Sequence, residues 1–213
     1  PDDSGGDLEL SLKTRTNKML AVLYKIEDEV SSVIQGDKLR STFFSKNIKQ
    51  GKRRLIERAN IDYSAHQINY LQQNIGKSQK PNQIQLPIES QIIYDPLSIF
   101  YAIRLMKFKV GESSESIDVF DRGKLYALSF KAVESSTIHS KTFGDRKVFQ
   151  VEPAAGFEGV LISSGKMTLW VDQETGIALR IKVEIPVGWA VAELTNSNHP
   201  NLESTQYRSR RSK

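Results

Sequence analysis

Short segments in which apolar and polar residues alternate run through most of the chain. The segment LELSL places Leu8, Leu10 and Leu12 on one side, and IALRIKVEI shows the same pattern near the C-terminal end. A period of two is typical of a β-strand with one buried face. About a dozen such segments, bounded by turn-forming residues, predict a mainly β protein. Strands and helices do not alternate, which argues against a parallel nucleotide-binding sheet.

Turn-forming residues divide these segments. Gln50-Gly51 is a plausible two-residue hairpin turn because glycine tolerates positive φ. Short turns also join the last three strands, which we expect to form an antiparallel meander. Residues 74–90 contain two prolines, a glycine and many amides. They are expected to be a surface connection or, alternatively, a lid.

One segment of the chain has a different pattern. Residues 94–108 read YDPLSIFYAIRLMKF. Asp95 is a good N-cap and Pro96 suits the first helical position, so we expect a helix over 96–108. An apolar stripe and its flanks cover nearly all of this helix, which predicts burial against the sheet. The expected stripe consists of Leu97, Tyr101, Leu105 and Phe108.

These elements predict a mainly β fold, with a strongly curved antiparallel sheet or an open barrel or half-barrel and one packed helix near 96–108. Among the 213 residues we expect a single β-rich domain over 8–195. Residues 1–7 are expected to be a flexible end and residues 196–213 a disordered basic tail.

Positive charge gathers in one part of the chain. The net charge is +5, and residues 38–58 carry a high density of Lys and Arg. The sequence KNIKQGKRRLIER could bind phosphates, lipid headgroups or an acidic protein, or it could be a solvated hairpin that protects a sheet edge. No pattern of stacking aromatic residues accompanies the charges, which argues against nucleic acid as a partner. The expected contact patch consists of Lys46, Lys49, Lys52, Arg53 and Arg54.

Arg104 lies in the middle of the apolar helix. A buried guanidinium needs a partner, so Arg104 either binds an anionic ligand, pairs with a carboxylate or extends outward to water. Trp170 is either a core residue or part of a binding surface. The candidates for a ligand-binding or structural motif are Asp95, Pro96, Ser98, Tyr101, Arg104 and Trp170.

Several chemistries find no support in the residues. The chain has no cysteine, and its three histidines, at 66, 139 and 199, are far apart. There is no GxSxG elbow and no phosphate-binding GxxxxGK[ST] loop. We therefore predict no catalytic residues, no metal ligands and no cofactor, although a carboxylate pair assembled from distant strands stays possible.

The segment DPLSIFYAIR resembles the signature of the bacterial family catalogued as domain of unknown function 3108. YKIEDEVSS, STFF and RANIDY are similar to its early strands, and GKMTLWVDQETGIALRIKVEIPVGWAVAEL is similar to its closing pattern. The likeness runs from about Leu8 to Leu194, with a departure at Ala178-Leu179. The resemblance implies an exported or envelope protein of largely β structure, and it implies no established activity.

We therefore expect a non-enzymatic protein of the periplasm or cell envelope. It would bind an apolar or amphiphilic ligand, or serve as a structural component of an envelope protein complex. The alternative is a hydrolase acting on cell-wall or lipid-linked glycans. No apolar run is long enough for a transmembrane segment, and the start at Pro1 suggests that a signal or anchor was removed.

Overall fold

The fold is mainly β, as the alternation predicts. A computed structural model describes residues 6–16, 25–76, 80–154, 166–185, 188–197 and 202. The described residues form fourteen strands and one helix, arranged in three sheets. The chain divides into two compact units, of which the first contains Pro1–Ile99 and Asp118–Tyr126, and the second contains Phe100–Ile117 and Ala127–Lys213. The expected single domain over 8–195 stays a prediction.

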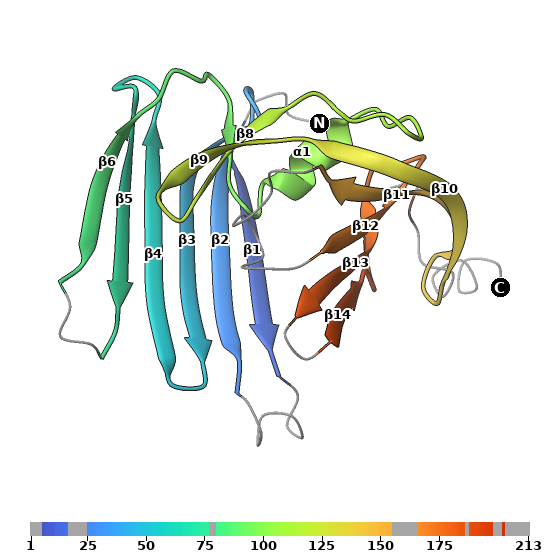
Figure 1. The fold of residues 1–213 in the computed structure, drawn as a ribbon, viewed down its shortest axis with the longest axis horizontal. Coiled ribbons are helices and arrows are strands. Elements are labelled where there is room, and N and C mark those ends of the chain that lie inside the picture. The colour runs from blue at the N-terminus through green and yellow to red at the C-terminus, as the bar shows by residue number, and fades with distance from the viewer. Residues whose placement is uncertain are drawn as a thin grey trace. The chain divides into compact units, whose positions relative to one another are not determined.

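The first unit is built on a six-stranded sheet whose strands follow one another in chain order (Figure 1). Each strand is antiparallel to the next, as expected for segments joined by short turns. The strands are β1 (Leu8–Arg15), β2 (Glu27–Gln35), β3 (Arg40–Gln50), β4 (Arg53–Asp62), β5 (Gln67–Asn74) and β6 (Asn82–Pro87).

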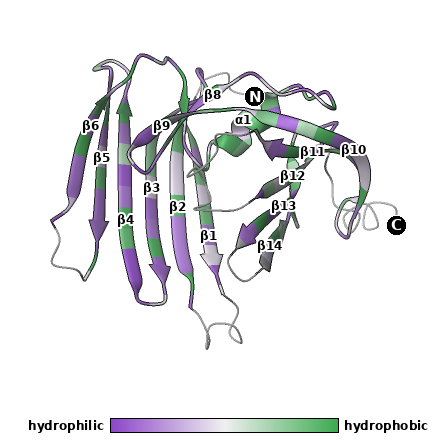
Figure 2. Cartoon of the chain, in the orientation of Figure 1, coloured by the Kyte–Doolittle hydropathy of each residue, from purple (hydrophilic) through white to green (hydrophobic). Residues whose placement is uncertain are grey.

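The register of this sheet separates two faces. Phe44, Ala59 and Tyr70 lie opposite one another on neighbouring strands and are buried. We call their side the core face, and the opposite side the outer face. Figure 2 shows the corresponding change between hydrophobic and hydrophilic residues along β3 and β4. The buried members of the core cluster are Phe44, Ala59, Ile61, Ile68, Tyr70, Ile88, Ile93 and Phe120.

A small three-stranded sheet, in the order β7-β8-β9, contributes to the same core. It consists of β7 (Ile93–Tyr94), β8 (Ile117–Asp121) and β9 (Lys124–Leu128). β7 pairs with β8 in parallel, whereas the other pairs described here are antiparallel. Arg122 and Gly123 join β8 to β9 with φ values of 48° and 77°, as a two-residue type I′ turn requires.

The helix is shorter than expected and buries a different face. α1 spans Ile99–Leu105, within the expected 96–108. Its buried residues are Ile99, Ala102 and Ile103, whereas Leu105 is 55% exposed. The expectation of burial all round was therefore wrong at Leu105. A helix of two turns shields one narrow stripe, so its last turn stays open to solvent.

The second unit contains a five-stranded antiparallel sheet in the order β10-β11-β12-β13-β14. Its last three strands form the expected meander. Phe143, Val148, Leu179 and Leu202 form a buried cluster, against which Trp170 packs. The strands are β10 (Phe130–Ser140), β11 (Gly144–Pro153), β12 (Met167–Asp172), β13 (Ala178–Ile185) and β14 (Gly188–Glu193).

Some expectations are corrected by these elements. None of the three sheets closes on itself within the described residues, so the curved barrel is not confirmed. β6 lies inside the segment 74–90 that was expected to be a connection. A strand that contains Pro87 is possible at this place because β6 is an edge strand. The missing N–H of Pro87 therefore breaks no hydrogen bond to a second neighbouring strand. The hairpin turn consists of Gly51-Lys52, one residue later than expected. The described residues exclude most of the expected ends, 1–7 and 196–213.

Candidate functional site

The DPLS segment forms a buried capping cluster at the start of α1. The backbone N–H of Ile99 donates to the carbonyl of Asp95 at 3.0 Å, which makes Asp95 the N-cap as predicted. Oδ1 of Asp95 accepts the N–H groups of Leu97 and Ser98 at 2.8 and 3.0 Å. Ser98 Oγ accepts the N–H of Asp95 at 2.7 Å, which completes a reciprocal capping box.

The second carboxylate oxygen of Asp95 connects this cap to the six-stranded sheet. Oδ2 accepts hydrogen bonds from Ser32 Oγ at 2.5 Å and from Ser41 Oγ at 2.6 Å. All three residues are at most 1% exposed. The capping cluster therefore satisfies the buried carboxylate within the protein, which favours the structural interpretation of Asp95, Pro96 and Ser98 over the ligand-binding one.

The other helix candidates do not join this cluster. The Arg104 guanidinium lies 5.8 Å from the centre of the Tyr101 ring and makes no ion pair with a described residue. Trp170 is half-buried in the second unit, with the Arg180 guanidinium 5.6 Å from its ring. Arg104 thus has an aromatic neighbour, and no described carboxylate pairs with it, although such pairing was one of the three alternatives. A ligand-binding role for Tyr101, Arg104 and Trp170 stays a prediction.

Four of the five predicted basic residues gather at the end of the β3–β4 hairpin. Lys49, Lys52, Arg53 and Arg54 are exposed, and Arg54 donates to the carbonyls of Gly51 and Arg53 at 2.8 Å. These bonds order the turn itself. The fifth residue, Lys46, lies deeper in the strand and on the core face, so it does not belong to this exposed patch.

Lys46 instead belongs to a buried cluster of charged groups. Its Nζ is hydrogen bonded to Asp121 Oδ1 and lies 3.6 Å from Glu57 Oε2. The side chains of Lys46, Glu57 and Asp121 are 14%, 4% and 0% exposed. Burial raises the pKa of Asp121, even though the neighbouring Lys46 and Arg122 act to lower it.

Three oxygens at this cluster are buried without a hydrogen-bond partner among the described residues. They are Glu57 Oε2, Tyr70 Oη and Asp121 Oδ2. Burial and the carboxylates of Glu57 and Asp121 raise the pKa of Tyr70. Unsatisfied buried polar atoms are rare and call for an explanation. The cluster was missed because Lys46 was assigned to the exposed end of the hairpin. Side chains alternate along β3, so Lys46 lies on the same face as Phe44, which is the core face.

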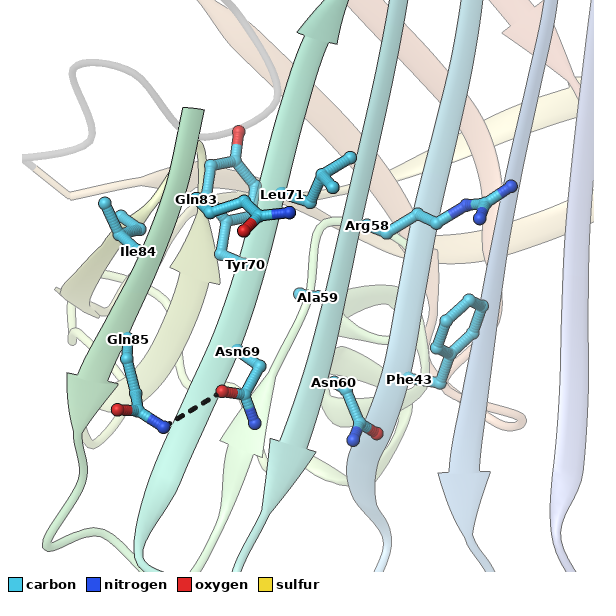
Figure 3. A pocket seen from close by; sticks show the side chains of 10 residues that line it. All are labelled: Phe43, Arg58, Ala59, Asn60, Asn69, Tyr70, Leu71, Gln83, Ile84 and Gln85. Atoms are coloured by element: carbon cyan, nitrogen blue, oxygen red, sulfur yellow. Dashed lines mark hydrogen bonds between the residues drawn. The ribbon is translucent and has the colours of Figure 1, made fainter. Parts of the chain in front are cut away.

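The outer face of the six-stranded sheet contains a shallow groove of about 530 Å³ (Figure 3). The Phe43 ring and the Leu71 side chain supply apolar surface, and the exposed Arg58 makes no ion pair with a described residue. Gln85 donates a 3.2 Å hydrogen bond to Asn69, drawn in Figure 3. The lining residues are Phe43, Arg58, Ala59, Asn60, Asn69, Tyr70, Leu71, Gln83, Ile84 and Gln85.

The groove shares Arg58 with a second hollow of about 320 Å³. In that hollow, Ser31 and Ser45 share a 2.8 Å hydrogen bond, and Lys13 pairs with Glu29 at 3.3 Å. Hydroxyl and amide groups and the guanidinium of Arg58 therefore extend across the outer face beside a small apolar surface. Sequence reasoning missed this face because its polar residues come from six separate strands.

In the second unit, the acidic turn after β12 has a structural arrangement. Asp172 forms a two-point ion pair with Arg146, at 2.8 and 2.9 Å, and accepts the Thr175 N–H at 2.9 Å. Burial raises the pKa of Asp172, but the hydrogen bonds from Arg146 and Thr175 outweigh it and hold that pKa below its usual range. Asp172 therefore orders this turn, and Glu174 also pairs with Arg146, at 3.0 Å.

Neither a metal site nor a membrane-spanning helix is found within the described residues. No three His, Asp or Glu side chains there come together in a way that could hold a metal ion. None of the described helical structure is long and apolar enough to cross a bilayer.

Comparison with known proteins gives one match. No curated protein and no solved structure is significantly similar to the chain. The model of the family described as protein of unknown function DUF3108 matches residues 4–195, which is most of the chain. The match includes the capping cluster, the buried cluster and the outer face. This chain is therefore a member of the DUF3108 family.

Proposed function

We propose that this protein is a non-catalytic component of the bacterial cell envelope that binds an amphiphile with an anionic head group. The envelope location follows from what the family resemblance implies. The observation that carries the binding proposal is the outer-face groove, in which Phe43 and Leu71 lie beside Arg58, whose guanidinium makes no ion pair with a described residue.

Each part of such a ligand has a counterpart in the groove. Contact of apolar chains with Phe43 and Leu71 stabilises the complex, because burying apolar surface contributes roughly 25 cal/mol per Å². A guanidinium binds phosphate or carboxylate through paired N–H donors, and Arg58 has no competing carboxylate among the described residues. Asn60 and Gln83 offer amide donors and acceptors for hydroxyl groups nearby.

The exposed position of the groove favours binding over catalysis. Glu57 and Asp121, which the core face brings together, are buried and engaged by Lys46. A substrate on the outer face would not reach them, because residues on the core face point to the opposite side of the sheet.

Vesicle co-sedimentation tests the proposal. The full chain should bind phosphatidylcholine vesicles that contain phosphatidylglycerol more tightly than pure phosphatidylcholine vesicles. Arg58→Gln should weaken that binding about tenfold, as expected for one charge-assisted contact. Arg53→Gln, at the hairpin end of the same sheet, is the charge-matched control and should change it little.

Two results would overturn this function. Absence of binding to both vesicle types would exclude the amphiphile. An equal effect of Arg53→Gln and Arg58→Gln would show a general attraction of positive charge to the vesicle surface and not a specific groove.

A further inference from the structure

The cluster of Lys46, Glu57 and Asp121 brings an amine and a carboxyl group into direct contact inside the core of the first unit. Lys46 on β3 lies opposite Glu57 on β4. Asp121 is the last residue of β8 and meets them across the core. Lys46 Nζ is hydrogen bonded to Asp121 Oδ1, and the Glu57 carboxylate lies 3.6 Å away.

The surroundings of this cluster are apolar and aromatic. The Phe44 ring centre lies 5.1 Å from Lys46 Nζ, and the rings of Tyr70 and Phe120 pack edge to face at 5.5 Å. Removing charged groups from water into such surroundings is unfavourable. The attraction within a buried ion pair offsets this desolvation free energy only when the remaining polar atoms of the pair are hydrogen bonded. Here Glu57 Oε2 and Asp121 Oδ2 have no such partner among the described residues.

We propose that Lys46 and Asp121 are joined by an isopeptide bond, an amide between Lys46 Nζ and Asp121 Cγ, and that Glu57 carries the protons during its formation. Contact between the reacting groups replaces a bimolecular encounter, which removes much of the entropic barrier. The amide would also replace the buried ammonium group of Lys46 by a neutral, polar group.

The reaction balances with the groups present. Glu57 takes a proton from the Lys46 ammonium, and the neutral amine attacks Cγ of the protonated Asp121 carboxyl. The C–N bond forms, one of the two amine protons moves through Glu57 to the departing hydroxyl, the other stays on the amide nitrogen, and one C–O bond breaks. The products are the amide, one water molecule and a protonated Glu57, so no oxidant or co-reactant is needed.

Two neighbouring features assist this step. Arg122 Nε lies 3.4 Å from Asp121 Oδ2, where negative charge develops as the amine attacks. Burial raises the pKa of Asp121, which favours the protonated carboxyl that condensation requires. The resulting crosslink would tie the β8–β9 hairpin covalently to the six-stranded sheet.

Intact mass spectrometry of the denatured full chain is the first test. The expected mass is that of the sequence minus one water molecule. Fragmentation should then give a branched peptide in which Lys46 is linked to Asp121, and trypsin should fail to cleave after Lys46. A mass equal to that of the unmodified sequence would overturn the proposal.

Three variants make the assignment specific. Lys46→Arg should have the mass calculated from its sequence, with no loss of water. If this variant still lacked one water molecule, the dehydration would lie at another site and the proposed bond would be rejected. Asp121→Asn should lose the mass of ammonia in place of water, because the leaving group changes. Glu57→Gln should keep the full mass while circular dichroism shows a folded chain, and crosslinking in this variant would reject the role of Glu57. The wild-type mass decides the proposal even if a variant fails to fold.

Discussion

Ser41 donates a 2.6 Å hydrogen bond to Oδ2 of Asp95, although the two residues are 54 positions apart in the chain and both are fully buried. Oδ1 of the same carboxylate caps α1. One side chain therefore specifies where the helix begins and fastens that start to the six-stranded sheet. This double role explains why Asp and Ser stand together in the DPLS segment.

Replacing Asp95 should destabilise the protein severely. Asp95→Ala removes an N-cap, worth about 1–2 kcal/mol. It also takes the carboxylate acceptor from the buried Ser32 and Ser41 hydroxyls, of which Ser41 keeps its 2.8 Å hydrogen bond with Ser98, at about 1–3 kcal/mol. We expect the free energy of unfolding in urea to fall by about 2–5 kcal/mol. The exposed Asp37→Ala should change it by less than about 0.5 kcal/mol. A loss of under 1 kcal/mol in Asp95→Ala would contradict the double role.

Gly176 should be far less tolerant of alanine than Gly111. Both glycines have positive φ, 70° and 88°, so both substitutions cost about 1–2 kcal/mol of backbone strain. A Cβ at Gly176 would also collide with the carbonyl oxygen of Arg104, whereas a Cβ at Gly111 would meet nothing within 4 Å. Urea unfolding should show an additional loss of about 1–3 kcal/mol for Gly176→Ala. Equal losses would mean that the turn after β12 does not approach the end of α1 this closely.

The Arg146–Asp172 pair should protect the fold against acid. Burial acts to raise the pKa of Asp172, but hydrogen bonds from Arg146 and Thr175 hold it below its ordinary value in the folded state. Its contribution to stability is therefore present above the unfolded pKa of about 3.9 and is lost as the pH falls through the lower folded pKa. Arg146→Gln should be less stable than the wild type at pH 7, and the difference should shrink below about pH 4.

A surface pair supplies the control for this acid titration. Arg180 pairs with Glu193 at 2.7 Å, and both side chains are partly exposed. Arg180→Gln should change stability by no more than about 1 kcal/mol at any pH. If the Arg146→Gln difference stayed constant as the pH fell from about 4 to 2, the ion pair would not be the cause.

Tyr63 should give a stability loss at alkaline pH. Burial raises its pKa to about 12, even though the hydrogen bond with Ile93 and the nearby Arg40 act to lower it. A raised pKa means that the contribution is complete below the unfolded pKa of about 10 and is lost as the pH rises towards 12.

Comparison of Tyr63→Phe with the wild type isolates this effect. The variant should be less stable at neutral pH because the Tyr63 hydroxyl donates to the Ser41 carbonyl at 2.9 Å. The difference in unfolding free energy between the two proteins should narrow as the pH rises from about 10 to 12. Narrowing that begins well below pH 10 would point to another titrating group.

Local patterns in the sequence predicted what depends on a few neighbouring residues. Alternation predicted the strands, and the closing meander followed from its short turns. Asp95 was predicted correctly as the N-cap because a cap acts within one helical turn, although α1 begins at Ile99 and not at Pro96. The same logic overestimated the length of α1, because apolar residues up to Phe108 suit a helix or another buried segment equally well. The many amide side chains of residues 74–90 likewise led to the prediction of a connection or lid, where the structure has the edge strand β6.

The sequence by itself determined that the chain is mainly β, that Asp95 caps its helix and which family it resembles, since strand alternation, capping and short motifs are local properties. Only the tertiary structure decided that Lys46 meets Asp121, 75 residues away, and that Ser32 and Ser41 meet Asp95. These contacts depend on strand register and on which element covers the core face. The register of a strand sets the positions of all its side chains at once. Charged residues that are far apart in the chain therefore become neighbours only when the whole sheet has formed.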